Sequence, residues 1–151
     1  NILYQSFFLF SSKIDRFKNY LFQINKHIKK NLQNAVDSIR EAAKKGAQII
    51  CLPELFLSNY FCQTENPENF SLAEPIPGPT SFLFCKLAKE LEIVLIVPLF
   101  EKRTEGIYHN SAIVIDTDGS LSGTYRKMHI PDDPCFYEKY YHKIHIQFYY
   151  L

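Results

Sequence analysis

The stretch Ala47-Gln48-Ile49-Ile50-Cys51-Leu52-Pro53-Glu54 decides the fold, because it joins a predicted helix to a predicted strand and ends in a carboxylate. In residues 28–45, apolar side chains recur at three- and four-residue spacing, which predicts a helix with one apolar face. Gly46 is a typical C-cap for such a helix. The apolar run at 48–52 predicts a short buried strand. A helix that leads directly into a buried strand indicates a fold of packed helix and sheet layers.

Downstream of this unit, the pattern predicts a long loop, a second helix and a central strand. Residues 58–79 contain four prolines, which cannot continue a helix or an interior strand, so this segment is predicted to be a loop. Thr80 is predicted to cap a helix that runs to about Leu91. Residues 93–100 are apolar and β-branched, as is typical of a central strand, and Pro98 is expected to break its ladder near the end.

A hairpin is predicted next along the chain. Residues 108–116 and 120–126 are predicted to pair around the turn Asp116-Thr117-Asp118-Gly119. Residues 127–134 are then expected to leave the sheet as a loop. Residues 1–25 show no clean period, and we expect them to form a divergent, poorly ordered leader; a short strand at residues 20–24 is the alternative.

The bulk composition is that of one globular domain. The chain has 151 residues, 46% of them hydrophobic and 22% charged, which allows a real core and argues against disorder. The net charge of +1 gives no electrostatic basis for binding nucleic acid or an anionic membrane, so neither is expected as a partner. No apolar run reaches the roughly 18–20 residues that a transmembrane helix needs.

The four cysteines predict neither a metal site nor a disulfide framework. Cys51, Cys62, Cys85 and Cys135 are widely spaced and include no C-x-x-C pair, so a zinc site is not expected. A chain with a sufficient core does not need disulfides. Free thiols in a reducing compartment are the simpler interpretation, which predicts a cytoplasmic location.

Two candidate site residues stand where strands are predicted to end. Glu54 follows a buried strand, where layered sheets place their sites, and is a candidate general base; a surface glutamate in a turn is the alternative. Lys127 follows the hairpin and is a candidate for stabilising an oxyanion; a solvated lysine is the alternative. Glu138 lies among aromatic residues and is a candidate partner of Lys127 or of a substrate. Pairing with Lys139 on the surface is its alternative.

Several motifs resemble those of the nitrilase, or carbon–nitrogen hydrolase, superfamily over roughly residues 29–141. The most specific are Leu52-Pro53-Glu54-Leu55-Phe56 and residues 125–134, which surround the two candidate residues. Residues 127–139 are similar in detail to the N-carbamoylputrescine amidase branch. Other segments that look like family segments, in the expected order, are residues 31–54, Tyr60-Phe61-Cys62-Gln63, residues 75–80 and His109-Asn110-Ser111-Ala112.

This resemblance implies an α+β fold that is part of a four-layer α-β-β-α sandwich, with homo-oligomers expected for full-length members. It implies hydrolysis of a non-peptide carbon–nitrogen bond in a small amide or carbamoyl amine. The resemblance to one branch of the family implies N-carbamoylputrescine as the substrate, whose hydrolysis yields putrescine, carbon dioxide and ammonia in polyamine biosynthesis. The family's roles would make Glu54 the general base, Lys127 the oxyanion-stabilising lysine and Glu138 a supporting glutamate. A cysteine forms a thioester, and no metal or organic cofactor is implied.

The nucleophile is where the chain departs from this family. The family's cysteine belongs a few dozen residues beyond Lys127, in an Ile-Cys-Trp-like motif, whereas this chain has no tryptophan and ends at Leu151. Cys135 stands where the branch usually has glycine, and its use as a replacement nucleophile is a remote alternative. We therefore expect the chain to lack the nucleophile and to be inactive alone.

The ends of the chain complete the predicted organisation. Residues 26–141 are predicted to be the N-terminal part of a carbon–nitrogen hydrolase domain, and residues 142–151 a divergent tail. Residue 1 is asparagine and the single methionine is Met128, so we expect a partial or processed product. The alternative to an amidase is a non-catalytic remnant, or an interaction module that keeps the scaffold.

Overall fold

The computed structural model describes residues 5–7, 9–10, 20–22, 28–131 and 133–143, with a five-stranded sheet as its main element. The strand order is β2-β4-β5-β6-β7; β4 and β5 are parallel, and the other neighbours are antiparallel. The strands are β2 (Leu9–Phe10), β4 (Ile49–Cys51), β5 (Val94–Thr104), β6 (Ile107–Ile115) and β7 (Leu121–Arg126). A separate two-stranded sheet pairs β1 (Gln5–Phe7) with β3 (Tyr20–Phe22).

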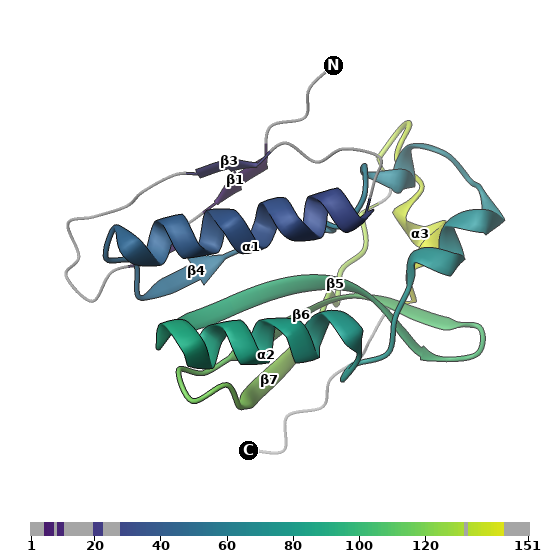
Figure 1. The fold of residues 1–151 in the computed structure, drawn as a ribbon. Helices are drawn as coiled ribbons and strands as arrows, with labels where there is room; N and C mark the ends of the chain where they lie inside the picture. Colours follow the sequence, from purple (N-terminus) through teal and green to yellow (C-terminus); the bar gives the residue numbers. More distant parts are fainter. Residues whose placement is uncertain (1–4, 8, 11–19, 23–27, 132, 144–151) are drawn as a thin grey trace.

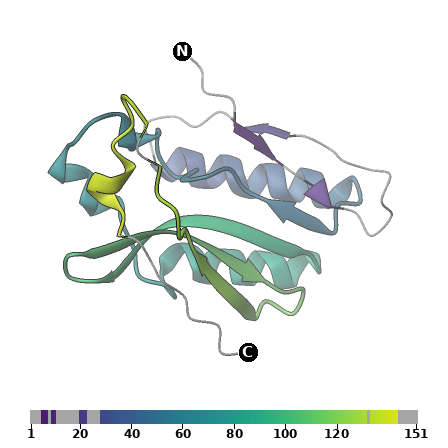
Figure 2. The same cartoon turned by 180° about the vertical axis from the view of Figure 1, so that it is seen from behind.

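Two long helices cover one face of the five-stranded sheet, as opposite views show (Figures 1 and 2). They are α1 (Ile28–Lys44) and α2 (Pro79–Leu91). Between the helices and the sheet lies a core of fully buried apolar side chains, and each stabilises the fold by about 1.5–3 kcal/mol relative to exposure. Its largest members are Ile39, Ile50, Phe56, Phe84, Leu95, Val97, Leu99, Ile113 and Ile115. The other face is covered at one end, where Tyr141 of the short helix α3 (Glu138–Tyr141) packs against Phe100 of β5.

The elements predicted from periodicity are present. The first helix and the short strand after it are α1 and β4, and the second helix and central strand are α2 and β5. The predicted hairpin is β6 and β7, and Gly119 of its turn has a φ of +82°. A Cβ on Gly119 would lie 2.6 Å from the carbonyl oxygen of Cys85, so the turn packs directly on α2. The α+β fold class is confirmed.

The break in the ladder predicted at Pro98 is found on one side of β5 only, because the pairing with β4 ends at Ile96 while the pairing with β6 continues. The strand β5 continues to Thr104, and Pro98 pairs with Ala112 of β6. The N–H of Val94 points toward β4, so the nitrogen of Pro98, four residues later, faces the same side. Since β4 ends opposite Ile96, the missing N–H of Pro98 removes no hydrogen bond between β4 and β5.

The start of the second helix and the preceding loop also differ from prediction. Gly78, not Thr80, is the N-cap of α2, and its N–H donates to the Ser81 hydroxyl, which donates back to its carbonyl. The loop 58–79 contains two 3₁₀ helices, η1 (Phe61–Gln63) and η2 (Pro67–Leu72). The expected disorder of 1–25 falls mostly on residues outside the described ones; β1, β2 and β3 lie within that segment.

Candidate active site

Glu54 is presented by a turn that begins where β4 ends. The next residue, Leu55, has a left-handed backbone with φ of +50°, a conformation that costs a non-glycine residue on the order of 1 kcal/mol. Its side chain is buried in a second apolar cluster with Phe61, Phe100 and Tyr141. Packing of Leu55 therefore holds the turn that directs Glu54 into the site.

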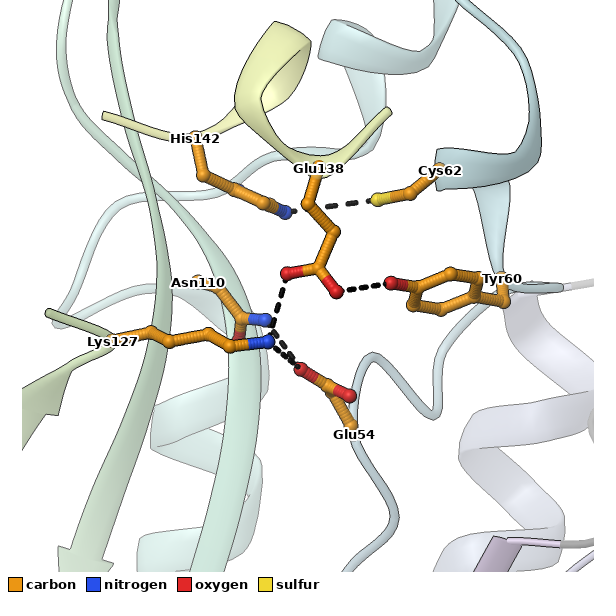
Figure 3. Close-up of polar contacts among 7 residues, drawn as sticks. All are labelled: Glu54, Tyr60, Cys62, Asn110, Lys127, Glu138 and His142. Atoms are coloured by element: carbon orange, nitrogen blue, oxygen red, sulfur yellow. Dashed lines mark hydrogen bonds and ion pairs between the residues drawn. The ribbon is translucent and has the colours of Figure 1, made fainter. Parts of the chain in front are cut away.

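Lys127 lies between two carboxylates (Figure 3). It follows β7 directly, and its backbone N–H donates to the carbonyl of Asn110 at 2.8 Å. Its Nζ donates to Oε1 of Glu54 at 3.2 Å and to Oε2 of Glu138 at 2.8 Å. Lys127 thus points inward rather than into solvent, and the structure brings together all three residues singled out from the sequence.

Glu138 is almost fully buried, and both of its oxygens are bonded. It begins the short helix α3 (Glu138–Tyr141), with a side chain that is 7% exposed. Its Oε1 accepts a hydrogen bond from the hydroxyl of Tyr60 at 2.5 Å, while Oε2 faces Lys127. The alternative of a solvated surface glutamate therefore does not hold.

Glu54 keeps one oxygen available. Its Oε1 accepts from both Lys127 and the Nδ2 of Asn110, the latter at 2.6 Å. Its Oε2 has no hydrogen bond within the described part of the chain, and the side chain is 39% exposed. A carboxylate that is anchored by one oxygen and open at the other can accept a proton from a nucleophile beside it.

The charge states of the site follow from these contacts. Burial alone would lower the pKa of Lys127, but the hydrogen bond to Glu138 and the charge of Glu54 outweigh it, so the pKa is raised and the ammonium stays protonated. Burial, and then the hydrogen bond to Glu138, raises the pKa of Tyr60, which therefore remains a donor. The cluster holds one cation and two carboxylate groups, a balance that favours a positively charged ligand.

Tyr60 and Asn110 are site residues that sequence reasoning missed. Both lie within segments that resemble the family, but an isolated tyrosine in a loop and an asparagine in a strand give no chemical signal by themselves. Their partners are distant in sequence, since 78 residues separate Tyr60 from Glu138 and 56 separate Asn110 from Glu54.

None of the cysteine sulfurs bonds to Glu54, Lys127 or Glu138 within the described part of the chain. Cys62 is fully buried and lies 3.8 Å from Nε2 of His142, and burial raises its pKa to about 12. A thiol with such a pKa is a poor nucleophile. Cys135 is exposed and has a φ of +70°, a backbone conformation that favours glycine.

The described residues include no group of three or more His, Cys, Asp or Glu side chains that could hold a metal ion. Nor does any helix among them have the length and apolar character needed to cross a membrane.

Comparison with known proteins identifies the family. The sequence model of the carbon–nitrogen hydrolase family matches residues 21–144. This chain belongs to the carbon–nitrogen hydrolase family. The predicted superfamily is thereby confirmed.

Two relatives show how much of the length of a family protein this chain spans. It is 49% identical over 112 residues to N-carbamoylputrescine amidase from Oryza sativa subsp. japonica, which covers 74% of this chain and 37% of the rice protein. It is 45% identical over 112 residues to citrullinase from Francisella tularensis, covering 74% of this chain and 39% of that protein. The chain spans about two fifths of the length of these relatives.

A solved structure supports the same assignment. The crystal structure of a carbon-nitrogen hydrolase from Helicobacter pylori G27 superposes with a TM-score of 0.76 at 42% identity, over 82% of this chain and 42% of that one. The predicted fold, part of a nitrilase-type sandwich, is therefore confirmed. The catalytic roles of Glu54, Lys127 and Glu138 stay predictions.

We expect His142 to make the stability of this chain sensitive to acid. It lies next to Cys62, and burial lowers its pKa to about 4 from an ordinary value near 6.5. Between these values the unfolded chain binds a proton that the folded chain does not, so stability present above about pH 6.5 is lost as the pH falls. We expect the free energy of unfolding to drop by about 2–3 kcal/mol from pH 7 to pH 4 on this account.

Urea unfolding at several pH values measures this effect, with His142→Gln as the matched variant that cannot titrate. Other acid-sensitive groups, such as Glu101, contribute equally to both proteins, so the difference between the two curves isolates His142. The groups that act on its charge are Glu138, Lys127 and His109. If the free energy of unfolding depends on pH in the same way for both proteins, the prediction is contradicted.

Proposed function

We propose that this chain carries the acid–base part of a carbon–nitrogen hydrolase site. The observation that carries the proposal is the position of the Lys127 ammonium between Glu54 and Glu138, 3.2 Å and 2.8 Å from their nearest oxygens. A lysine held this way is charged and oriented before a substrate arrives. Preorganised charge of this kind stabilises an oxyanion without reorganisation during the reaction.

In this mechanism a cysteine thiol gives its proton to the open Oε2 of Glu54 as the sulfur attacks the carbonyl carbon. The carbonyl oxygen becomes an oxyanion beside the ammonium of Lys127. When the carbon–nitrogen bond breaks, Glu54 returns the proton to the leaving nitrogen. Water, activated by the same carboxylate, then hydrolyses the acyl–sulfur bond and regenerates the thiol. Glu138 and Tyr60 keep Lys127 in place through both steps.

We propose a carbamoylated amine as substrate, with N-carbamoylputrescine as the specific case. Relatives are named for N-carbamoylputrescine and for citrulline, and both molecules carry a terminal ureido group on an aliphatic chain. Attack on that group releases ammonia, and hydrolysis leaves a carbamate that loses carbon dioxide to give the free amine. The excess of carboxylate over ammonium groups at the site suits a substrate with a second, protonated amine.

The cysteine is the part that the described residues do not bring to the site. We therefore propose that the chain alone releases no ammonia from N-carbamoylputrescine, and that Cys135→Ser changes nothing. The four free thiols suit a reducing compartment such as the cytoplasm. The homo-oligomers expected for full-length members stay a prediction.

A chimera tests the function directly. Residues 28–141 of this chain would replace the matching segment of the rice protein, which is 49% identical over 112 residues. We expect the chimera to release ammonia and putrescine from N-carbamoylputrescine in equal amounts. A chimera that folds and is inactive would favour the second candidate, a scaffold without catalysis.

A further inference from the structure

A second buried charge cluster lies beside the candidate site and takes no part in the proposed chemistry. Glu101 of β5 is 2% exposed. Its Oε2 accepts hydrogen bonds from the Ser111 hydroxyl at 2.6 Å and from Nε of Arg126 at 2.7 Å. Its Oε1 accepts from Nη2 of Arg126 at 2.6 Å. One carboxylate therefore ties together β5, β6 and β7, three adjacent strands of the sheet.

Stability alone does not account for this arrangement. Removing a carboxylate from water is costly, and well-packed apolar side chains in place of a buried ion pair are often neutral or stabilising. What the pair supplies is geometry, because a guanidinium that binds both oxygens of a carboxylate has a defined position and orientation. The best-attested use of buried ion pairs is to set the register between elements.

The cluster fixes the pairing of β6 with β7 at the residues next to the candidate site. Ser111 and Arg126 are direct partners across β6 and β7. Each is next to a site residue in the sequence. Asn110 comes directly before Ser111, and Lys127 comes directly after Arg126. Because successive side chains of a strand point to opposite faces, Asn110 of the site and Ser111 of the cluster lie on opposite faces of β6.

Lys127 depends on this support because it lies just past the end of β7. Its backbone is joined to β6 by the hydrogen bond to Asn110. Movement of the strand end by about 1 Å would take its Nζ out of hydrogen-bonding range of at least one carboxylate.

We propose that Glu101, bound by Ser111 and Arg126, is a positioning residue that holds Lys127 between Glu54 and Glu138. Glu101 touches no reacting group in this proposal. Its importance for catalysis rests on the proposed function of Lys127, whereas its effect on the position of Lys127 does not. The two are therefore tested separately, the first with the chimera and the second on the chain itself.

Competitive acetylation of the intact chain with acetic anhydride, read by peptide mass spectrometry, reports on Lys127. An ammonium held by two carboxylates reacts slowly, so Lys127 should react more slowly than the exposed Lys86 on α2. In Glu101→Gln we expect acetylation of Lys127 to become roughly threefold to tenfold faster, because an ammonium that moves away from its carboxylate partners has a lower pKa and loses its proton more readily. Acetylation of Lys86 should not change.

Two further variants separate positioning from stability. Arg126→Lys keeps the charge but loses the bidentate geometry, so acetylation of Lys127 should also become faster in this variant. The double variant Glu101→Met with Arg126→Met should keep the wild-type thermal midpoint and still label Lys127 faster. Lys127 labelling within twofold of wild type in the folded variants would overturn the proposal, and so would failure of all of them to fold. An unprotected Lys127 in the wild-type chain would instead contradict the candidate site.

Discussion

Replacing Arg126 with alanine is expected to lower the free energy of unfolding by about 3–5 kcal/mol. The change removes two hydrogen bonds from Glu101, whose side chain is 2% exposed in the intact chain, and leaves Ser111 as its remaining side-chain partner. An uncompensated buried charge is far more costly than the pair is favourable. Since most domains are stable by only about 5–15 kcal/mol, the variant should be close to its unfolding threshold.

Chemical denaturation followed by circular dichroism measures this loss. Arg40→Ala is the matched control, because Arg40 also binds both oxygens of a glutamate, Glu90, but at the surface. With side chains 44% and 55% exposed, that pair is screened by solvent and should contribute far less to stability than the buried pair. Equal losses in the two variants would show that burial of Glu101 does not decide the cost.

Glu54→Gln in the active chimera is expected to lower kcat by roughly 10²–10⁴-fold, the usual contribution of a general base. Glutamine preserves the size of the side chain and an oxygen that can accept from Lys127 and Asn110. It cannot take a proton from the nucleophile or return one to the leaving nitrogen. We expect KM to change little, because the contacts that hold the site residues are largely kept.

Steady-state ammonia release measures this effect, and Glu68→Gln, on the exposed surface of η2, is the control for carboxylate loss. The chimera and both variants should have the same circular dichroism spectrum. A reduction in kcat of less than tenfold for Glu54→Gln would mean that another group accepts the proton.

The fold of the middle of the chain was predictable because its signals are local. The three- and four-residue apolar spacing of α1, the glycine that ends it and the apolar run of β4 act over a few residues each. Pro98 shows the limit of this reasoning. Whether a proline disrupts a strand depends on which neighbour its nitrogen faces, and that depends on where β4 ends.

The candidate site was predictable only in part. Glu54 and Lys127 could be found because each follows a strand within a recognisable motif. Tyr60, Asn110 and the Glu101 cluster could not, since a polar residue in a loop or strand does not reveal a partner many residues away. The pairing of Glu138 with Lys127 rather than Lys139 likewise depended on burial, which the sequence left open.

The sequence by itself determined the family, the order of helices and strands, and the three acidic and basic residues at the centre of the site. Those properties follow from local periodicity and short motifs. Only the tertiary structure decided that Lys127 lies between two carboxylates, that one oxygen of Glu54 stays open, and that a buried ion pair supports the strand end behind them. The physical reason is that these contacts join strands and loops whose positions are set by sheet order and packing, which no short stretch of sequence encodes.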